Sequence, residues 1–182
     1  GFLSGEKSRR RNLSRTSIGL GLILLSLSLI SMASAPLREA ETASMILAPL
    51  ASEPILAILI AALITWLAHS SVAIVLLIVS LAALQVLSID LALILVLGAN
   101  FGGAIAAVTM TLSSTAATKR IPLGNLGMRL IGVLIVLPLV PWVQPYIAMV
   151  DDTPARMIAN FHLAFNVFLA VLFLPLIGVV MK

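Results

Sequence analysis

Long apolar runs alternate with short polar stretches along the chain, and this pattern predicts membrane-spanning helices. A helix needs about 20 apolar residues to cross the hydrocarbon core of a bilayer. Between Pro54 and Thr118 the only formally charged residue is Asp90. A stretch this long must be broken, because one helix of that length would be far longer than a bilayer is thick. The expected spans and the broken segment cover residues 16–35, 54–87, 91–112, 122–143 and 155–181.

The first break is the sequence Ala-His-Ser-Ser at residues 68–71, which divides segment 54–87 into two arms. Each arm has about 15 residues, roughly 22 Å of helix, which is short of the hydrocarbon core of about 30 Å. No charged loop joins the arms. We therefore expect a re-entrant helical hairpin whose tip lies in the middle of the membrane, where irregular backbone is tolerated inside protein. Two complete spans joined at the membrane surface are the alternative.

The second break is Gly-Ala-Asn-Phe-Gly-Gly at residues 98–103. Small residues allow close helix packing, and the same residues suit the unwound centre of a discontinuous helix. If the helix is discontinuous, two helix N-termini meet in the membrane, near Ser71 and Gly102. Helix N-termini attract anions, and hydroxyls and freed carbonyls bind hard cations such as sodium. This arrangement predicts an anion site without lysine or arginine, as in a secondary transporter coupled to a cation.

Composition excludes a water-soluble fold. Of the 182 residues, 61% are hydrophobic and 10% are charged, whereas ordinary globular domains have about 25% charged residues. The chain has no cysteine, which removes disulfide and thiolate chemistry. The formal net charge is +4, but its basic cluster directly precedes the first apolar run, where such clusters hold a helix end in the cytoplasm. Nucleic-acid binding is therefore not expected.

The charges also predict the topology. Residues 1–15 form a basic cytoplasmic segment, and residues 16–182 form a transmembrane domain in the cell membrane. The polar stretch 36–54, with a short interfacial helix, lies outside. Lys119 and Arg120 then lie inside, Asp151 and Asp152 in a loop from 145 to 156 lie outside, and both ends of the segment are cytoplasmic. A signal peptide over the first 35 residues is an alternative, and a chain that opens with glycine is expected to be part of a longer protein.

A faint internal repeat appears at an offset of 37 residues. The sequence Asn-Leu-Gly-Met-Arg at 125–129, with Leu-Pro-Leu at 137–139, aligns with His-Leu-Ala-Phe-Asn at 162–166, with Leu-Pro-Leu at 174–176. Both copies place polar residues early in an apolar span and a proline near its end.

Three motifs carry a resemblance to a known family. Thr65-x-x-x-His69-Ser70-Ser71-Val-Ala resembles the T-x-x-x-Q-S-S-S-A signature of the sodium/phosphate cotransporter family. Leu-Gly-Ala-Asn-Phe-Gly at 97–102 resembles its L-G-A-N-I-G element, and the segment 159–166 resembles its A-x-x-H-x-x-F-N element. The resemblance covers the chain from about Ser17 onward.

With this resemblance the expected fold is an all-α integral membrane protein, a bundle of transmembrane helices with a re-entrant helical hairpin and a discontinuous helix. The resemblance implies one half of an inverted-repeat transporter, most like its second repeat, with the missing first repeat elsewhere in the same polypeptide. It implies sodium-coupled symport of inorganic phosphate, with no cofactor other than the coupling sodium and no enzymatic activity. The lipid bilayer is a partner, and a homo-oligomer is left open. The chain departs from the family pattern at several positions, and each departure removes or alters an oxygen ligand. The departing residues are His69, Val72, Gly103, Ala104 and Arg129.

The resemblance also supplies candidate site residues. Substrate and ion contacts are expected at Thr65, His69, Ser70, Ser71, Gly98, Asn100 and Gly102. Sodium is expected at Ser70, Ser71 and Asn100. His162 and Asn166, four residues apart on one helix face, are expected to support the site or to bond to each other or to a neighbouring span. Asp90 is expected to be a helix cap.

Other interpretations remain open. His69 can be a packed neutral ring, and the two serines can bond back to helical carbonyls. An intramembrane serine protease would pair Ser70 or Ser71 with His162, but the sequence around the serines lacks the glycines that let backbone amides face a reacting oxygen. A scaffold or sensor subunit that transports nothing is the alternative from the structural class.

Overall fold

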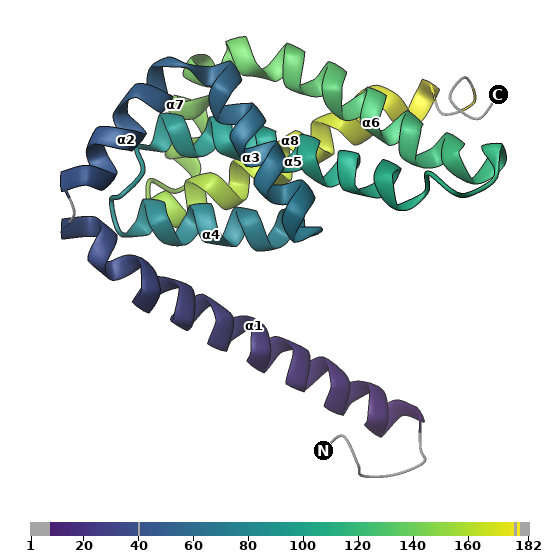
Figure 1. Ribbon diagram of the computed structural model, residues 1–182, viewed down its shortest axis with the longest axis horizontal. Helices are drawn as coiled ribbons and strands as arrows, with labels where there is room; N and C mark the ends of the chain where they lie inside the picture. The colour runs from purple at the N-terminus through teal and green to yellow at the C-terminus, as the bar shows by residue number, and fades with distance from the viewer. Residues whose placement is uncertain (1–7, 40, 177, 179–182) are drawn as a thin grey trace.

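The computed structural model describes residues 8–39, 41–176 and 178, and in these residues the secondary structure is helical (Figure 1). Within these residues, four segments are long and apolar enough to cross a membrane: 10–33, 89–110, 116–150 and 154–176. The chain is therefore a multi-pass membrane protein, as the apolar pattern predicts. The elements are α1 (Ser8–Glu39), α2 (Glu41–Ser52), α3 (Pro54–Ala68), α4 (Ser71–Ala83), α5 (Ile89–Met110), α6 (Ala116–Val136), η1 (Leu137–Leu139), α7 (Val140–Val150), α8 (Pro154–Phe173) and η2 (Leu174–Leu176).

Helix α1 contains the expected first span and projects away from the other helices (Figure 1). It touches α4 through the hydroxyls of Ser31 and Ser80, which lie 3.1 Å apart. Most of its described leucine and isoleucine side chains are exposed. The polar stretch that follows contains the expected short helix, α2.

Helices α3 and α4 form the predicted helical hairpin. Pro54 opens α3, where its missing N–H is not needed. His69 ends α3 in the left-handed conformation, with φ of 54°. Ser70 is extended and caps α4, because its hydroxyl accepts the N–H of Ala73 at 3.2 Å. The arms have 15 and 13 residues, so each is too short to span a bilayer core of about 30 Å.

The tip of this hairpin lies inside the length of the bundle, not at its end (Figure 1). The tip residues share a pocket with Asn125 and Arg129 of α6. Residues 116–124 of α6 precede this level and correspond to about 13 Å of helix. A re-entrant hairpin requires this depth within the protein; its position in a bilayer stays a prediction.

Helix α5 is the centre of the bundle, and it is continuous from Ile89 to Met110. The expected discontinuous helix is therefore wrong. A Cβ atom added at Gly98 would lie 2.7 Å from the Cβ of Ala61, and one at Gly102 would lie 2.7 Å from the Cα of Ala62. The glycines allow α3 to pack directly on α5, which is the packing interpretation of the motif.

Two further expectations about α5 are wrong. No second helix N-terminus lies near Gly102, where Asn100 is a mid-helix residue, and Asp90 is not the cap of α5. At the start of α5 the cap is Ser88, whose hydroxyl accepts the N–H of Leu91 at 3.3 Å; Asp90 lies in the first turn.

Helix α6 continues through the 3-10 turn η1 into α7, and the chain changes direction there (Figure 1). Pro138 lies in η1 and Pro141 follows in the first turn of α7, and proline interrupts helical hydrogen bonding. The expected loop from residue 145 is too long, because α7 runs to Val150 and the connection is 151–153. Both Leu-Pro-Leu copies of the repeat form a 3-10 turn after a helix.

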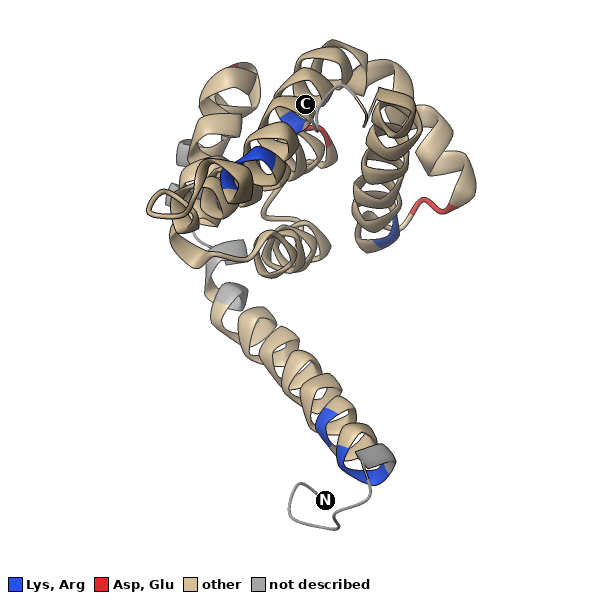
Figure 2. Cartoon of the chain, turned by 90° about the vertical axis from the view of Figure 1, so that its right-hand side faces the viewer, with Lys and Arg blue, Asp and Glu red and all other residues tan. Residues whose placement is uncertain are grey.

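Most charged residues lie near the ends of the helices, and Arg129 lies inside α6. Basic residues lie at the N-terminal end of α1, and acidic residues lie in the connection before α8 (Figure 2). The N-terminal end of α1, the α5–α6 turn and the end of α8 lie toward one side of the molecule in Figure 1. This arrangement fits the expected topology, and the side that faces the cytoplasm stays a prediction.

Candidate functional site

An open pocket of about 250 Å³ lies at the hairpin tip. The turn between α3 and α4, the middle of α5 and the first half of α6 form its walls. Its lining is polar for a membrane protein: His69, Ser70, Ser71, Val72, Gly103, Asn125 and Arg129. Three of the candidate site residues are therefore brought together here.

The hairpin turn aims the positive end of α4 at this pocket. The first N–H groups of a helix have no partner within it. The Ser70 hydroxyl takes the N–H of Ala73, which leaves the N–H groups of Ser71 and Val72 at the pocket. The His69 ring packs back on its own helix, with Nδ1 at 3.0 Å from the carbonyl oxygen of Leu67. Because a carbonyl only accepts, this bond forms in the tautomer that has its proton on Nδ1, and in that tautomer Nε2 is an acceptor.

Ser71 and Thr65 meet α5 at Gly103. A Cβ atom at Gly103 would lie 3.1 Å from the Cβ of Ser71 and 4.0 Å from Cγ2 of Thr65. Thr65 is fully buried, and within the described part of the chain its hydroxyl oxygen has no hydrogen-bond partner. An unpaired buried polar atom costs about 1–3 kcal/mol. This hydroxyl therefore marks a position where an ion or water would find an oxygen ligand.

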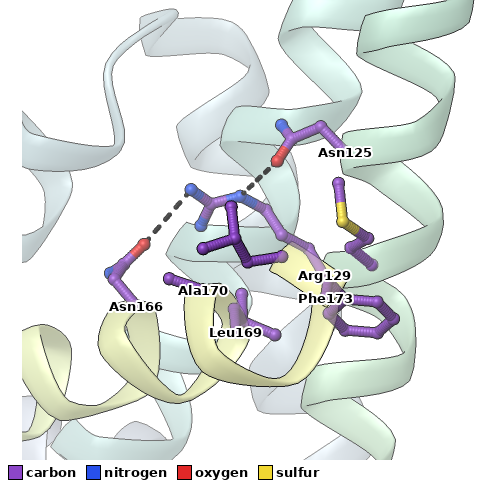
Figure 3. A pocket seen from close by; sticks show the side chains of 8 residues that line it. Asn125, Arg129, Asn166, Leu169, Ala170 and Phe173 are labelled. Atoms are coloured by element: carbon purple, nitrogen blue, oxygen red, sulfur yellow. Dashed lines mark hydrogen bonds between the residues drawn. The ribbon is translucent and has the colours of Figure 1, made fainter. Parts of the chain in front are cut away.

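Arg129 is the centre of a polar cluster behind the tip. Its guanidinium donates to the side-chain oxygens of three asparagines from three helices. Nη1 bonds to Asn100 on α5 at 2.5 Å, Nε bonds to Asn125 on α6 at 3.3 Å, and Nη2 bonds to Asn166 on α8 at 3.3 Å. Figure 3 shows the bonds to Asn125 and Asn166.

The amide nitrogens of two of these asparagines are held elsewhere, which fixes the direction of their oxygens. The nitrogen of Asn100 donates to the Val96 carbonyl at 2.8 Å and faces Nδ1 of His162 at 3.1 Å. The nitrogen of Asn166 donates to the His162 carbonyl at 2.8 Å. Their oxygens therefore point at Arg129.

A second open pocket, of about 270 Å³, adjoins the cluster on the side of α8 (Figure 3). Asn125 and Arg129 line both pockets, so these two side chains form the wall between them. The rest of the second lining is mostly apolar: Met128, Asn166, Leu169, Ala170, Phe173 and Leu174.

The charge at this site is positive and unbalanced. Among the described residues, no carboxylate lies within 4 Å of Arg129. An ion pair away from the site joins Arg156, in the first turn of α8, to Asp151 in the connection before it, at 4.0 Å. In that connection the Thr153 hydroxyl and N–H bond to Asp151 and hold the pKa of its carboxyl below the usual value. The hairpin pocket combines a guanidinium with a helix N-terminus, and both attract anions.

The structure separates the candidate residues into groups. His69, Ser70 and Ser71 line the pocket, and Thr65 lies just behind it. Asn100, His162 and Asn166 belong to the cluster around Arg129. Gly98 and Gly102 pack against α3 and do not line the pocket.

One expected role does not match its position. The oxygen of Asn100 accepts from Arg129 and from Asn166, so it is not open to sodium. The protease pair is not formed either, because the described side-chain bonds of His162 go to Asn100 and Asn166 and not to a serine.

Sequence reasoning missed Arg129 as a site residue. Two signals could have found it. A charge inside an apolar span is costly and usually functional, and the repeat at an offset of 37 aligns Arg129 with Asn166. These aligned residues contact each other in the structure.

The fold and the site define a multi-pass helical membrane protein with an anion-attracting pocket between its helices. Comparison with known sequences gives the family. The model of the Na+/Pi-cotransporter family matches residues 37–181, and the chain belongs to this family, as the three motifs indicate.

Two proteins of known sequence are similar to this chain over almost its whole length. "Putative inorganic phosphate export protein YjbB" of Escherichia coli (strain K12) is 36% identical over 176 residues, which are 97% of this chain and 32% of that protein. "Uncharacterized protein YqeW" of Bacillus subtilis (strain 168) is 31% identical over 175 residues, 96% of this chain and 57% of that protein. The chain thus spans about a third of the length of the first relative. No solved structure matches it.

Proposed function

We propose that the complete protein moves inorganic phosphate across the cell membrane and that the hairpin-tip pocket is part of its phosphate site. The observation that carries the proposal is the shared lining of this pocket by Arg129 and by the N-terminus of α4. Phosphate suits both groups, because its oxygens accept bonds from guanidinium and from helix N–H groups. Membership of the Na+/Pi-cotransporter family supports phosphate as the anion.

The roles at the tip follow from the geometry. The N–H groups of Ser71 and Val72 and the hydroxyl of Ser71 offer donors to a phosphate oxygen. His69 stands at the rim with Nε2 available as an acceptor for a protonated phosphate oxygen. Arg129 faces the same space from α6. We propose His69, Ser70 and Ser71 as substrate contacts and add Arg129 to them.

Sodium coupling is the form of transport that the family's name suggests. In sodium-coupled transport, the hydroxyl oxygens of Ser70, Ser71 and Thr65 coordinate the sodium ion. The Thr65 hydroxyl is buried and has no hydrogen-bond partner within the described residues. Asn100 drops out of this ligand set. The re-entrant position of the hairpin and the contribution of a second repeat from the same polypeptide are further parts of the proposal.

The direction of transport depends on what drives it. Coupling to an inward sodium gradient moves phosphate inward. Without such coupling, a membrane potential that is negative inside drives an anion outward, by about 2.3 kcal/mol per charge per 100 mV. The relative in Escherichia coli is named for export, so we propose that flux be measured in both directions.

The test is phosphate flux through the full-length protein in liposomes. Wild-type protein should move radiolabelled phosphate, and Ser71→Ala should reduce the flux because it removes a hydroxyl from the pocket. Ser113→Ala, in the exposed turn between α5 and α6, is the matched control and should leave the flux unchanged. No phosphate flux in either direction, from protein that is folded, would overturn the proposal and favour the scaffold or sensor alternative.

A further inference from the structure

We propose that Arg129 is a tethered cation: its guanidinium fills a cation position built from three asparagine oxygens and supplies the positive charge of the tip pocket, so that phosphate binding there needs no sodium. The inference rests on the proposed function, since it concerns the same site. What it adds is the residue that supplies the positive charge of the tip pocket, which neither the family description nor the relatives' names state.

The first support is the surroundings of the guanidinium. Its three described side-chain partners are the oxygens of Asn100, Asn125 and Asn166, which come from three different helices. Amide oxygens are also the ligands that proteins offer to hard metal cations. The guanidinium of Arg129 therefore lies among neutral oxygens, as a metal cation does in its binding site. Unlike a free cation, it is covalently part of α6.

The second support is that two of the three oxygens do not depend on Arg129 for their orientation. The amide nitrogens of Asn100 and Asn166 are bound to the carbonyls of Val96 and His162, both at 2.8 Å. Their oxygens face the cation position because their nitrogens are held behind it. These two sides of the cage are therefore preorganised.

The third support is the charge balance. Among the described residues no carboxylate lies within 4 Å of the guanidinium, and an uncompensated charge within a membrane protein is costly. Neutral amides solvate the guanidinium but leave its full charge. Arg129 is partly exposed and borders the open pocket at the hairpin tip, so an anion that enters this pocket balances the charge.

The internal repeat shows what the arginine replaces. Arg129 aligns with Asn166 at the offset of 37 residues, so a second asparagine at this position would surround the same space with amide groups alone. In that form the space would carry no fixed charge of its own, and that charge would have to come from a free cation. Because a guanidinium and a sodium ion cannot occupy one space, the arginine removes that requirement.

The experiment compares phosphate binding and flux for the full-length protein in media of sodium or N-methylglucamine. Wild-type protein should bind phosphate equally well in both media. Arg129→Ala should weaken phosphate binding in the sodium-free medium by about 10- to 100-fold, the usual value of a charged hydrogen bond to a ligand. Added guanidinium ion, or sodium, should restore part of the binding by entering the vacated cage.

Two further variants keep the test decisive if Arg129→Ala fails to fold. Asn125→Asp places a carboxylate four residues before Arg129, where the Asn125 oxygen already accepts from Nε at 3.3 Å. This variant keeps the cage and adds a favourable helical pair, but it neutralises the charge and should weaken phosphate binding. Arg156→Ala removes an equal charge from an exposed position outside the pocket and should bind phosphate normally.

The outcomes separate this inference from the proposed function. Phosphate binding that requires sodium in the wild type, or wild-type binding by Asn125→Asp or by folded Arg129→Ala in the sodium-free medium, would overturn the tethered cation and leave phosphate transport standing. No flux in either medium would overturn the proposed function itself.

Discussion

The close contact between α3 and α5 can be tested by adding one methyl group, in Gly102→Ala. The new Cβ would lie 2.7 Å from Cα and 2.8 Å from the carbonyl carbon of Ala62. Carbon atoms pack best at about 3.5–4.0 Å, so α3 would have to retreat by about 1 Å. These are backbone atoms, and no rotamer change can relieve the clash.

The magnitude follows by comparison with a control, Gly127→Ala. Gly127 is a helical glycine in α6, and nothing lies within 4 Å of a Cβ added there. Both variants gain the helix propensity of alanine over glycine, about 1 kcal/mol, so this gain cancels in the comparison. The difference isolates the overpacking, which typically costs about 1–3 kcal/mol.

The assay is reversible unfolding of the full-length variants in detergent, together with phosphate flux. Gly102→Ala should be less stable than Gly127→Ala by about 1–3 kcal/mol. Its phosphate flux should also fall. Thr65 of α3 and Ser71, at the start of α4, pack beside the neighbouring Gly103, so both shift when α3 retreats. Equal stability of the two variants would refute the close packing and would reopen the unwound form of this segment.

Two other predictions concern single groups. His69→Ala should lower phosphate flux, because it removes the ring that lines the tip pocket and that we propose as a phosphate contact; unchanged flux would remove His69 from the site. Thr153→Val should raise the pKa of the Asp151 carboxyl toward its usual value, because it removes the hydroxyl donor at 2.6 Å and keeps the N–H donor at 3.0 Å. A lowered carboxyl pKa stabilises the folded state above about pH 4, and this stabilisation is lost only in more acid solution. The carboxyl is ionised at neutral pH in both proteins, so the substitution should leave phosphate flux at neutral pH unchanged. NMR titration of the Asp151 carboxyl carbon tests the shift, and an unchanged pKa would contradict the prediction.

Local chemistry was enough to predict the class of the protein and the hairpin. Apolar length predicts which segments can cross a membrane, and four long apolar segments occur. The turn between α3 and α4 falls at His69 and Ser70, where the sequence places a polar break between two short arms. A serine can cap a helix through contacts within a few residues, so no distant partner is needed to place this turn.

The glycine segment of α5 could not be resolved in this way. Glycine serves an unwound helix and a tightly packed helix equally well, and the choice depends on what lies beside it. In the structure the backbone of α3 lies against Gly98 and Gly102, so the segment stays helical. The sequence of α5 alone does not show that α3 packs against it.

The cluster around Arg129 depends even more on the tertiary structure. Its asparagines lie at positions 100, 125 and 166, on three helices whose relative placement no local pattern determines. The sequence by itself determined that an arginine lies within an apolar span, which marks it as costly. Only the packing of α5, α6 and α8 decided that three oxygens meet its guanidinium and that its charge faces the hairpin tip, because hydrogen bonds between helices form only where the helices bring their side chains within about 3 Å of each other.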